Sequence, residues 1–400
     1  MVAQPHQRHI LALNGGSSSL KFGLYETSAI GADGQGPLTV LAAGAVEGIG
    51  GEEPARFQIK AGRRKLLIDE AIGGATHLTA LARIARMLSE SGLPPPDAIG
   101  HRVVHGGPSL LAHCRLDARV LTEITAASTL APLHAPATLA IIRQSRKLFP
   151  RRPQFACFDT AFHAVLPELS RRLPLNQALH DAGIRRYGFH GLSCESALRQ
   201  IGQPQAHRII IAHLGSGSSV TAIRDGCSVD TSMGLTPGGG VPMASRSGDL
   251  DPGVLLYLMR TTLWTPARIE TLIDRESGLL GISGISGDIR QLQLLAASSD
   301  RARLAIAIYC MAVAKQVAAM IAVLGGLDLL VFTGGIGEHN PRVRSAICDR
   351  LAWFGIALYP QRNAQALNPL NAAGSRAQVL LVSSREEEEI ARHAGGLMVA

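Results

Sequence analysis

The 400-residue sequence predicts an α/β protein built from two related halves. Apolar, strand-like runs alternate with helical segments along the chain, which is typical of folds with parallel or mixed sheets. One pattern also occurs twice, about half a chain apart: an apolar run, a tight Gly/Ser turn and a second apolar run. The two copies span residues 10–25 and 209–223. A duplicated hairpin of this kind indicates two similar domains that face one cleft.

The turns of the two hairpins indicate a bound polyphosphate. They read Asn14-Gly-Gly-Ser-Ser-Ser19 and His213-Leu-Gly-Ser-Gly-Ser-Ser219. Small residues allow backbone N–H groups and hydroxyls to approach an anion closely, and Lys21 adds a cation beside the first turn. Either turn alone would be equally typical of an ordinary hairpin, so it is the repetition that favours a phosphate site.

The other elements follow from apolar periodicity and from glycine and proline boundaries. Helical spacing predicts a helix over 66–92, and Ala98–Val104 has the pattern of a buried strand. The further expected elements are a helix over Thr138–Leu148, a strand over Phe155–Phe158, a glycine-rich loop over Gly234–Gly253, an apolar helix over 303–324, a strand over Leu329–Phe332 and the entrance of a helix over Arg385–Arg392. The glycine-rich loop is long for a compact domain, which favours a functional role. The apolar helix would lie in the core or at a subunit interface.

Composition argues against several other classes of protein. The formal net charge is +8, but the arginines are scattered and aromatic residues make up only 4%, so a nucleic-acid surface is not indicated. The six cysteines are widely spaced, unlike those of a zinc site or a disulfide framework. Lys315 and Gly325-Gly326 interrupt the most apolar stretch, Leu304–Phe332, which favours a buried helix and a strand over a membrane span. Met1–His9 lacks the apolar core of a signal peptide, so we expect a cytoplasmic protein.

At nine places along the chain the residues resemble those of the acetate kinase family. The segments, in family order, are Asn14–Lys21, His101–Gly107, Ala131–His134, Phe158–His163, Tyr187–Gly191, His213–Gly215, Asp230–Gly234, Arg246–Pro252 and Phe332–Glu338. Acetate kinases belong to the superfamily of sugar kinases and actin. The resemblance therefore implies two similar ribonuclease-H-like domains around a nucleotide cleft. Residues 1–157, completed by 386–400, would form the acyl- and phosphoryl-side domain, and 158–385 the nucleotide-binding domain.

The resemblance also implies a reaction: reversible, direct in-line transfer of the γ-phosphoryl group of ATP to acetate, giving acetyl phosphate and ADP. Propionate or a longer short-chain acid is the alternative acceptor, and an actin-like ATP-binding module is the non-enzyme alternative. Such a transfer needs cations on the phosphoryl oxygens and Mg²⁺ (or Mn²⁺) on the phosphates, but little covalent chemistry from the protein. The family further implies a cytoplasmic homodimer without a nucleic-acid or membrane partner.

By resemblance the catalytic residues are Asp159, His190, Arg246 and His134. Arg102 would bind the acyl carboxylate and Arg246 the transferring phosphoryl group, and the planar fork of arginine suits both anions. An imidazole at His190 can donate to a developing phosphoryl oxygen. The acceptor acid is already ionised at neutral pH, so we expect Asp159 to organise the metal and the local field rather than to act as a base.

The remaining assignments also come from the resemblance. The acyl pocket would be lined by Val104, Leu133, Phe189 and Pro237, and the magnesium site formed by Asn14 and Glu386. The nucleotide segments would contribute Ser17, Ser19, Lys21, His213, Gly215, Ser216, Gly217, Asp288, Ile289, Arg290, Gly335, Ile336, Gly337, Glu338 and His339. The sequence departs from the family pattern at Ala135, Thr138, Cys194, Ser216 and Gly238-Gly239-Gly240. These departures leave the preferred acid and nucleotide open.

Overall fold

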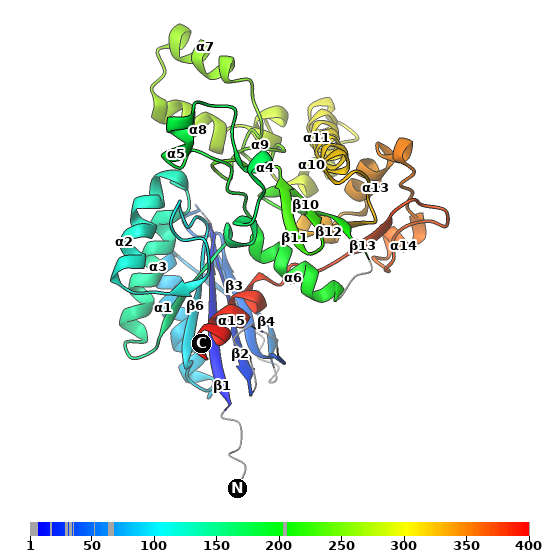
Figure 1. Ribbon diagram of the computed structural model, residues 1–400. Coiled ribbons are helices and arrows are strands. Elements are labelled where there is room, and N and C mark those ends of the chain that lie inside the picture. Colours follow the sequence, from blue (N-terminus) through cyan, green and yellow to red (C-terminus); the bar gives the residue numbers. More distant parts are fainter. Residues whose placement is uncertain are drawn as a thin grey trace. The chain divides into compact units, whose positions relative to one another are not determined.

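The computed structural model describes residues 7–16, 18–28, 31, 34, 36–51, 53–62, 68–202 and 206–399 (Figure 1). The chain divides into two compact units. Unit 1 comprises Met1–Ala164 together with Arg385–Ala400, and unit 2 comprises Val165–Ser384. Each unit has its own mixed sheet and its own hydrophobic core, so the predicted α/β class is confirmed.

Unit 1 is built on an eight-stranded sheet with the order β5-β4-β3-β2-β1-β6-β8-β7. Its strands are β1 (Arg8–Gly15), β2 (Ser19–Thr27), β3 (Thr39–Glu47), β4 (Ala55–Gly62), β5 (Asp69–Ile72), β6 (Ala98–Val103), β7 (Cys114–Arg115) and β8 (Gln154–Phe158). Strands β1 to β5 form an antiparallel meander, whereas β6 adds to β1 and β8 adds to β6 in the parallel direction. The parallel strands are almost fully buried, as expected for strands that are covered on both faces.

Helices cover both faces of this sheet. They are α1 (His77–Glu90), α2 (Ala118–Ala126), α3 (Ala135–Leu148) and α15 (Glu386–Leu397), with the 3-10 helices η1 (Ala127–Leu130) and η2 (Ala161–His163). Ile99 of β6 shares a core with Leu81 of α1, whereas the next residue, Gly100, faces α15. A Cβ atom at Gly100 would lie 2.6 Å from Cγ2 of Ile390. Helix α15 therefore packs against β6 more closely than a side chain at position 100 would permit.

Helix α1 begins later than its apolar spacing predicts. The predicted segment 66–92 includes β5, which pairs with β4 as an edge strand, and the helix starts at His77. Its N-terminus is a capping box in which the side chains of Thr76 and Thr79 each accept a hydrogen bond from the other's backbone N–H. The predicted start was wrong because apolar spacing alone does not separate a short edge strand from the first turns of a helix, whereas the cap does.

Unit 2 repeats the central part of this topology. Its five strands are β9 (Arg208–Leu214), β10 (Ser218–Arg224), β11 (Cys227–Thr231), β12 (Leu329–Thr333) and β13 (Gln378–Leu381), in the order β11-β10-β9-β12-β13. Strands β11, β10 and β9 are antiparallel, and β12 and β13 then add in the parallel direction. The strands β3-β2-β1-β6-β8 of unit 1 have the same order and the same directions. The two similar domains predicted from the repeated hairpin are therefore confirmed.

Unit 2 also contains most of the helices. They are α4 (Glu168–Arg171), α5 (Gln177–Asp181), α6 (Gly191–Ile201), α7 (Pro252–Thr262), α8 (Pro266–Arg275), α9 (Gly278–Ser283), α10 (Ile289–Leu295), α11 (Asp300–Leu324), α12 (Gly334–His339), α13 (Pro341–Asp349), η3 (Ala352–Phe354) and α14 (Pro360–Ala364). As expected, 234–251 forms neither helix nor strand.

Helix α11 is the single helix among the described residues that is long and apolar enough to cross a membrane by length and composition. It packs on β9 and β10, and its Tyr309 and Val313 are fully buried in the core of unit 2. This packing is typical of a core helix. The opposite side of the helix exposes Leu304, Ile308 and Met311, which are spaced one turn apart.

The parallel strands bring predicted site residues to one edge of each sheet. In unit 1, Asn14 and Arg102 lie near the carboxyl ends of β1 and β6, and Asp159 directly follows β8. In unit 2, His213 lies near the carboxyl end of β9, and Thr333 ends β12. The carboxyl ends of neighbouring parallel strands share one edge, which is where open α/β sheets bind their ligands.

Candidate active site

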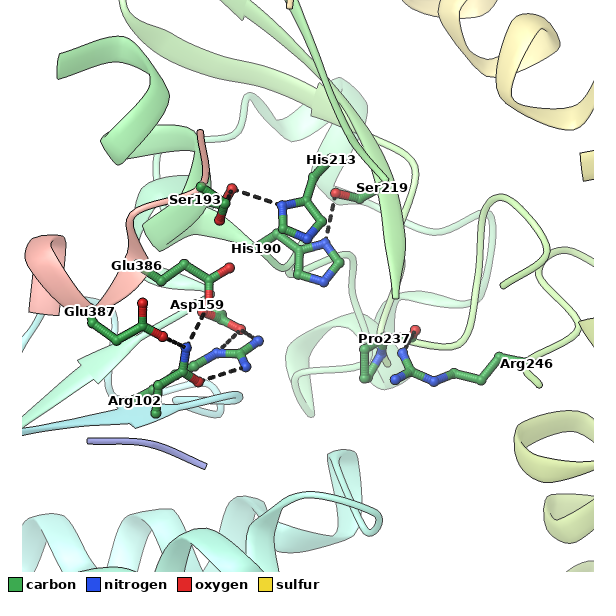
Figure 2. A network of polar contacts seen from close by, with 12 residues as sticks. Arg102, Asp159, His190, Ser193, His213, Ser219, Pro237, Arg246, Glu386 and Glu387 are labelled. Atoms are coloured by element: carbon green, nitrogen blue, oxygen red, sulfur yellow. Dashed lines mark hydrogen bonds and ion pairs between the residues drawn. The ribbon is translucent and has the colours of Figure 1, made fainter. Parts of the chain in front are cut away.

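An arginine paired with a buried aspartate lies at the ligand edge of unit 1. Arg102 donates from Nη2 and Nε to Oδ2 of Asp159, at 2.6 and 3.0 Å, and from Nη1 to Oδ1 of Asn14 at 3.1 Å (Figure 2). The Asp159 side chain is 1% exposed and that of Arg102 is 14% exposed. These contacts fix the plane of the guanidinium while leaving part of it accessible.

The C-terminal helix adds two carboxylates to this group. The Nδ2 atom of Asn14 donates to Oε2 of Glu386 at 2.9 Å and to Oε1 of Glu387 at 2.8 Å. We call Asn14, Arg102, Asp159, Glu386 and Glu387 the Arg102 cluster. With its carboxyl groups ionised, the cluster holds three negative charges against one positive charge, so its surplus is negative.

The negative charges of the cluster raise the pKa of Arg102. Burial lowers the pKa of Arg102, but the charges of Asp159 and Glu386 outweigh this effect, and the pKa lies above its ordinary value. The guanidinium therefore stays charged in spite of its burial, since a nearby opposite charge favours the ionised form. A fixed, permanently charged fork of this kind suits the recognition of a carboxylate.

The residues of the cluster fit a hard divalent cation. Mg²⁺ prefers oxygen ligands and is commonly held by one or two carboxylates together with water and phosphate oxygens. The surplus negative charge and the adjacent carboxylates of Glu386 and Glu387 offer such a donor set. The amide nitrogen of Asn14 donates to both glutamates and so orients their carboxylates. Its part in the magnesium site stays a prediction.

The first hairpin places its cation beside this cluster. Lys21 of β2 lies directly opposite Asn14 of β1 in the antiparallel ladder, and opposed residues project from the same face of a sheet. Lys21 is exposed and Ser19 is half-buried, and the carbonyl of Ser19 accepts a hydrogen bond from the N–H of Gly16 at 2.8 Å. Ser17 lies outside the described residues.

The acyl-side residues of unit 1 lie next to a small cavity. Val104 contributes to its lining, and the cavity volume is about 10 Å³. The other lining residues are Val103, His105, Ile124, Ala127, Ala131, Ala135 and Thr138. Leu133 and His134 are half-buried where η1 leads into α3, and His134 is the residue that precedes the helix. Two departures from the family pattern, Ala135 and Thr138, therefore border this space.

A pair of stacked imidazoles is the central feature of unit 2. The rings of His190 and His213 have centroids 4.1 Å apart and are inclined by 21°. Nδ1 of His190 is 3.0 Å from Oγ of Ser219, and Nδ1 of His213 is 2.8 Å from Oγ of Ser193 (Figure 2). His190 has a left-handed backbone with φ of 59°. This conformation is uncommon for a residue with a side chain, and strained backbone of this kind clusters at functional sites.

The second Gly/Ser turn lies against these rings. A Cβ atom at Gly217 would lie 3.1 Å from Nε2 of His190 and 3.7 Å from Nη1 of Arg246. One of the turn's glycines therefore allows an imidazole and a guanidinium to flank the same backbone. Nη1 of Arg246 also donates to the carbonyl oxygen of Pro237 at 2.8 Å, and Phe189, which precedes His190, is buried. Unit 2 thus brings His190, Arg246 and the turn together.

The glycine-rich loop that carries Arg246 is fixed by its own hydrogen bonds. The N–H of Gly240 donates to Oδ1 of Asp249 at 2.7 Å, and the N–H of Asp249 donates back to the carbonyl of Gly240 at 2.9 Å. Val241 and Met243 are fully buried beside them. The loop is therefore an ordered support for Arg246.

The turn after β12 lies beside the second hairpin. A Cβ atom at Gly215 would lie 4.0 Å from the backbone nitrogen of Gly335. Gly334 has a positive φ of 77°, and a Cβ there would meet the Leu214 carbonyl oxygen at 2.7 Å, so this position requires glycine. Ser216 and Gly335 are exposed. Exposed backbone at two adjacent glycine turns is suited to phosphate binding.

The other predicted nucleotide residues divide into accessible and structural ones. His339 is exposed, Ile336 is half-buried and Gly337 is buried, while Oε1 of Glu338 accepts a hydrogen bond from the N–H of Ser384 at 2.8 Å.

The segment at the start of α10 is partly structural. Asp288 caps α10 and pairs with the exposed Arg290 at 2.7 Å. The side chain of Ile289 belongs to the core of unit 2. The structure therefore leaves Ile289 only its backbone for contact with a ligand.

Some residues of these groups have no counterpart among the sequence predictions. Glu387 bonds to Asn14 as closely as Glu386 does, and Ser193 and Ser219 contact the two histidines. Arg344 is 1% exposed, and its Nη1 donates to the carbonyls of Gly337 and Glu338, which supports the end of α12. Ser219 belongs to the second Gly/Ser hairpin, but no sequence signal pairs either serine with a histidine.

Comparisons with known proteins identify relatives of this chain. Residues 9–392 match the model of the acetokinase family. A curated acetate kinase of Methylocella silvestris is 38% identical over 98% of both chains, and one of Ectopseudomonas mendocina is 42% identical over 96% of this chain and 97% of its own. The crystal structure of a propionate kinase from Francisella tularensis has a TM-score of 0.87 at 37% identity and covers 98% of this chain and 100% of its own. That of the Porphyromonas gingivalis acetate kinase has a TM-score of 0.81 at 33% identity, with coverage of 98% and 100%.

The contacts of the Arg102 cluster predict that Glu386 contributes more to metal binding than Glu387 does. Glu386→Gln removes a carboxylate that is 8% exposed and should weaken Mn²⁺ binding, measured by electron paramagnetic resonance, by roughly ten-fold or more, as expected for the loss of a charged oxygen ligand. Glu387→Gln should have a smaller effect because its side chain is more exposed. Glu388→Gln is the matched control, since Glu388 pairs with Arg392 on the same helix at 2.7 Å. A larger effect at Glu387 than at Glu386 would contradict the assignment.

Proposed function

The chain belongs to the acetokinase family, and we propose that it transfers the γ-phosphoryl group of ATP to acetate, giving acetyl phosphate and ADP, and that it catalyses the reverse reaction. It is a phosphotransferase with a carboxyl group as acceptor. The observation that carries the proposal is the Arg102–Asp159 pair, a buried and oriented cation at the ligand edge of a parallel sheet. ATP and ADP as co-substrates also favour a cytoplasmic location.

Arg102 is the proposed clamp for the acceptor carboxylate. A guanidinium has five N–H donors, and three of them serve Asp159 and Asn14 among the described residues. Two donors remain for an incoming carboxylate. Because Asp159 fixes the guanidinium plane, little side-chain entropy is lost when the acid binds. We propose that Asp159 orients Arg102 and contributes to the negative field that attracts the metal.

His190 and Arg246 are proposed to stabilise the phosphoryl group while it is transferred. In such a transfer, negative charge is spread over three equatorial oxygens, and catalysis rests on positioning and on cations rather than on covalent chemistry. Both side chains flank Gly217, so a phosphoryl group at this turn would meet a ring N–H and a guanidinium together. His134, which precedes α3, is a proposed catalytic residue by resemblance. Direct in-line transfer then needs no nucleophile from the protein.

Magnesium, held by Glu386 and Glu387 with Asn14 orienting them, would neutralise the phosphate charge that ATP brings to the site. Mn²⁺ has similar ligand preferences and is a suitable substitute. The proposed nucleotide contacts are the exposed turns at Ser216 and Gly335, together with the segments at Asp288–Arg290 and Ile336–His339. Lys21 and Ser19 would meet the phosphates from the first hairpin.

The small cavity beside Val104 bears on the choice of acid. Its lining is mostly apolar, as the methyl group of a short acid requires. Each further methylene that fits gains roughly 0.8 kcal/mol, whereas one that does not fit must displace packed side chains at a cost of roughly 1–3 kcal/mol. We therefore propose acetate first and propionate second. Leu133, Phe189 and Pro237 remain proposed members of the acyl pocket.

The alternatives make different use of the same residues. A kinase of longer acids would need an acyl pocket that accepts further methylenes without displacing packed side chains. An actin-like ATP-binding module would need the glycine turns but neither the Arg102–Asp159 pair nor the stacked histidines. The Arg102–Asp159 pair therefore favours the enzyme.

We also propose that two copies of the chain associate through unit 2. Helix α7 has no buried residue, and its Val254, Leu256 and Tyr257 are 42%, 51% and 64% exposed. An isolated helix of this length is marginal in water, and exposed apolar patches of this kind mark interaction surfaces. A second copy of the same surface is apolar in the same way, which makes a homodimer the simplest occupant. The exposed side of α11 offers further apolar surface.

A hydroxamate assay with ATP, Mg²⁺ and acids of two to five carbons tests the proposed reaction. Acetate and propionate should give kcat/KM values within about ten-fold of each other, since one methylene shifts binding by roughly 1 kcal/mol in either direction. Butyrate should be clearly poorer. Butyrate exceeding acetate would replace this proposal by the longer-acid kinase, and ATP binding without product from any acid would replace it by the non-enzyme module.

Two arginine variants should separate binding from transfer. Arg102→Ala should raise the KM for acetate roughly ten- to a hundred-fold, because it removes charge-assisted hydrogen bonds worth about 1.5–3 kcal/mol. Arg246→Leu should lower kcat by roughly two to three orders of magnitude with little change in the KM for ATP, as expected for a contact made in the transition state. Arg56→Ala, at an exposed ion pair with Asp69, is the control. An unchanged acetate KM in the first variant would exclude Arg102 as the clamp.

The dimer proposal is tested by light scattering after size-exclusion chromatography. Tyr257→Glu on α7 should convert dimers to monomers, because it places a charge in the proposed apolar interface. Leu169→Glu is the control, since Leu169 is a single leucine, 94% exposed, on α4. A monomeric wild-type protein would contradict the proposal.

A further inference from the structure

We propose that Ser219 and Ser193 are positioning residues that keep a proton on Nε2 of His190 and of His213, so that both rings donate hydrogen bonds toward the second Gly/Ser turn. The inference rests on the proposed phosphoryl transfer for its purpose. It goes beyond that transfer by assigning the residues that decide what the imidazoles can do.

The hydroxyls occupy one specific nitrogen of each ring. Oγ of Ser219 is 3.0 Å from Nδ1 of His190, and Oγ of Ser193 is 2.8 Å from Nδ1 of His213. Ser193 and Ser219 are fully buried, so water does not compete readily for these contacts. Oγ of Ser193 is also 3.3 Å from Oγ of Ser384, which can supply a proton donor behind it. Both histidines therefore have their Nδ1 atoms committed to a hydroxyl.

The other nitrogen of each ring faces the turn. A Cβ atom at Gly217 would lie 3.1 Å from Nε2 of His190, and one at Gly215 would lie 3.7 Å from Nε2 of His213. The two Nε2 atoms thus approach the two glycines that begin and end the turn. Because phosphate oxygens only accept hydrogen bonds, an Nε2 atom is useful there only when it carries a proton.

A hydroxyl is suited to this task because it can both donate and accept. When the imidazole is neutral, the serine donates to Nδ1 and the ring proton stays on Nε2. When the imidazole is charged, Nδ1–H donates to the serine and Nε2 still carries a proton. A carboxylate in the same place could only accept, so it would draw the proton of a neutral ring to Nδ1 and leave Nε2 bare. Serine is thus compatible with a protonated Nε2 in both charge states. Among the described residues the Ser219 hydroxyl has no other hydrogen-bond partner, so donation to Nδ1 is the contact that uses its proton.

The stacking of the rings makes this control necessary. Two positive charges about 4 Å apart repel each other strongly in a buried place, and the guanidinium of Arg246 approaches the same turn. This repulsion disfavours the state in which both rings are charged, and a neutral ring has a choice of tautomer. The partner at Nδ1 decides that choice, as it does for metal-bound histidines.

Each serine contacts the histidine that is not its neighbour in the fold. Ser219 of β10 lies directly opposite His213 of β9 in the ladder, yet it bonds to His190. Ser193 lies in the first turn of α6, which begins directly after His190, yet it bonds to His213. Each serine is thus held by the element beside one histidine while it orients the other, which fixes both rings relative to the turn.

The test uses the full-length protein labelled with ¹⁵N-histidine and two-bond ¹H–¹⁵N correlation spectra, which distinguish protonation at Nδ1 from protonation at Nε2. In the wild type without substrate, the neutral fraction of both histidines should carry its proton on Nε2. Ser219→Asp should move the proton of neutral His190 to Nδ1 and lower kcat roughly a hundred-fold, the usual effect of losing one transition-state donor, with the KM for acetate unchanged. Ser219→Thr keeps the hydroxyl and should restore both the spectrum and kcat.

Further variants keep the inference testable if the buried aspartate prevents folding. Ser219→Ala should give His190 a mixture of tautomers and reduce kcat about two- to ten-fold, the range expected for one neutral hydrogen bond. Thr221→Val is the matched control, because it removes a buried hydroxyl of β10 that pairs with Thr231 and not with a histidine. It should leave both histidine signals unchanged.

Two results would overturn the inference: Nδ1 protonation of the neutral histidines in the wild type, or Ser219→Ala with both spectrum and kcat unchanged. A wild-type protein with the expected spectrum but without acetyl phosphate formation would instead overturn the proposed function alone.

Discussion

The geometry of both units depends on one constraint, the shared edge at which neighbouring parallel strands end. Strands β1, β6 and β8 deliver Asn14, Arg102 and Asp159 to this edge in unit 1, and β9 and β12 deliver His213 and the glycine turn after Thr333 in unit 2. Because each strand is held on both sides by backbone hydrogen bonds, the side chains at its end are positioned by the sheet and not by flexible loops. The same five-strand topology therefore positions different side chains at the strand ends of each unit.

The two edges differ in charge in a way that agrees with their proposed tasks. The Arg102 cluster has surplus negative charge, and a buried surplus of this kind is stable only with a cation beside it. The turn of unit 2 lies beside two imidazoles and the guanidinium of Arg246. One edge is therefore suited to a metal and a carboxylate clamp, and the other to an anionic phosphoryl group.

Much of this arrangement could be predicted from the sequence because the signals were local. The hairpins, the buried strand before Asp159 and the helix over 303–324 each follow from a short run of residues with a clear boundary. The start of α1 was missed because β5 pairs with β4, and pairing between strands does not appear in the spacing of one segment. Glu387 could not be separated from Glu386 because the placement of α15 depends on long-range packing. One example is Ile390 against Gly100, almost three hundred residues apart in the chain.

The serines illustrate a more general limit on prediction from motifs. A motif identifies the residue that carries a charge or donates a proton, such as His190 or His213, because that residue type is constrained by the chemistry. The group that orients it is constrained only by position. Ser193 of α6 contacts His213 of β9, and Ser219 of β10 contacts His190, which precedes α6. Their contribution arises from the crossing of two elements, which has no signature in either one. The proposed role of a histidine at this turn therefore depends on its Nδ1 partner, because the proposal needs that partner to leave a proton on Nε2.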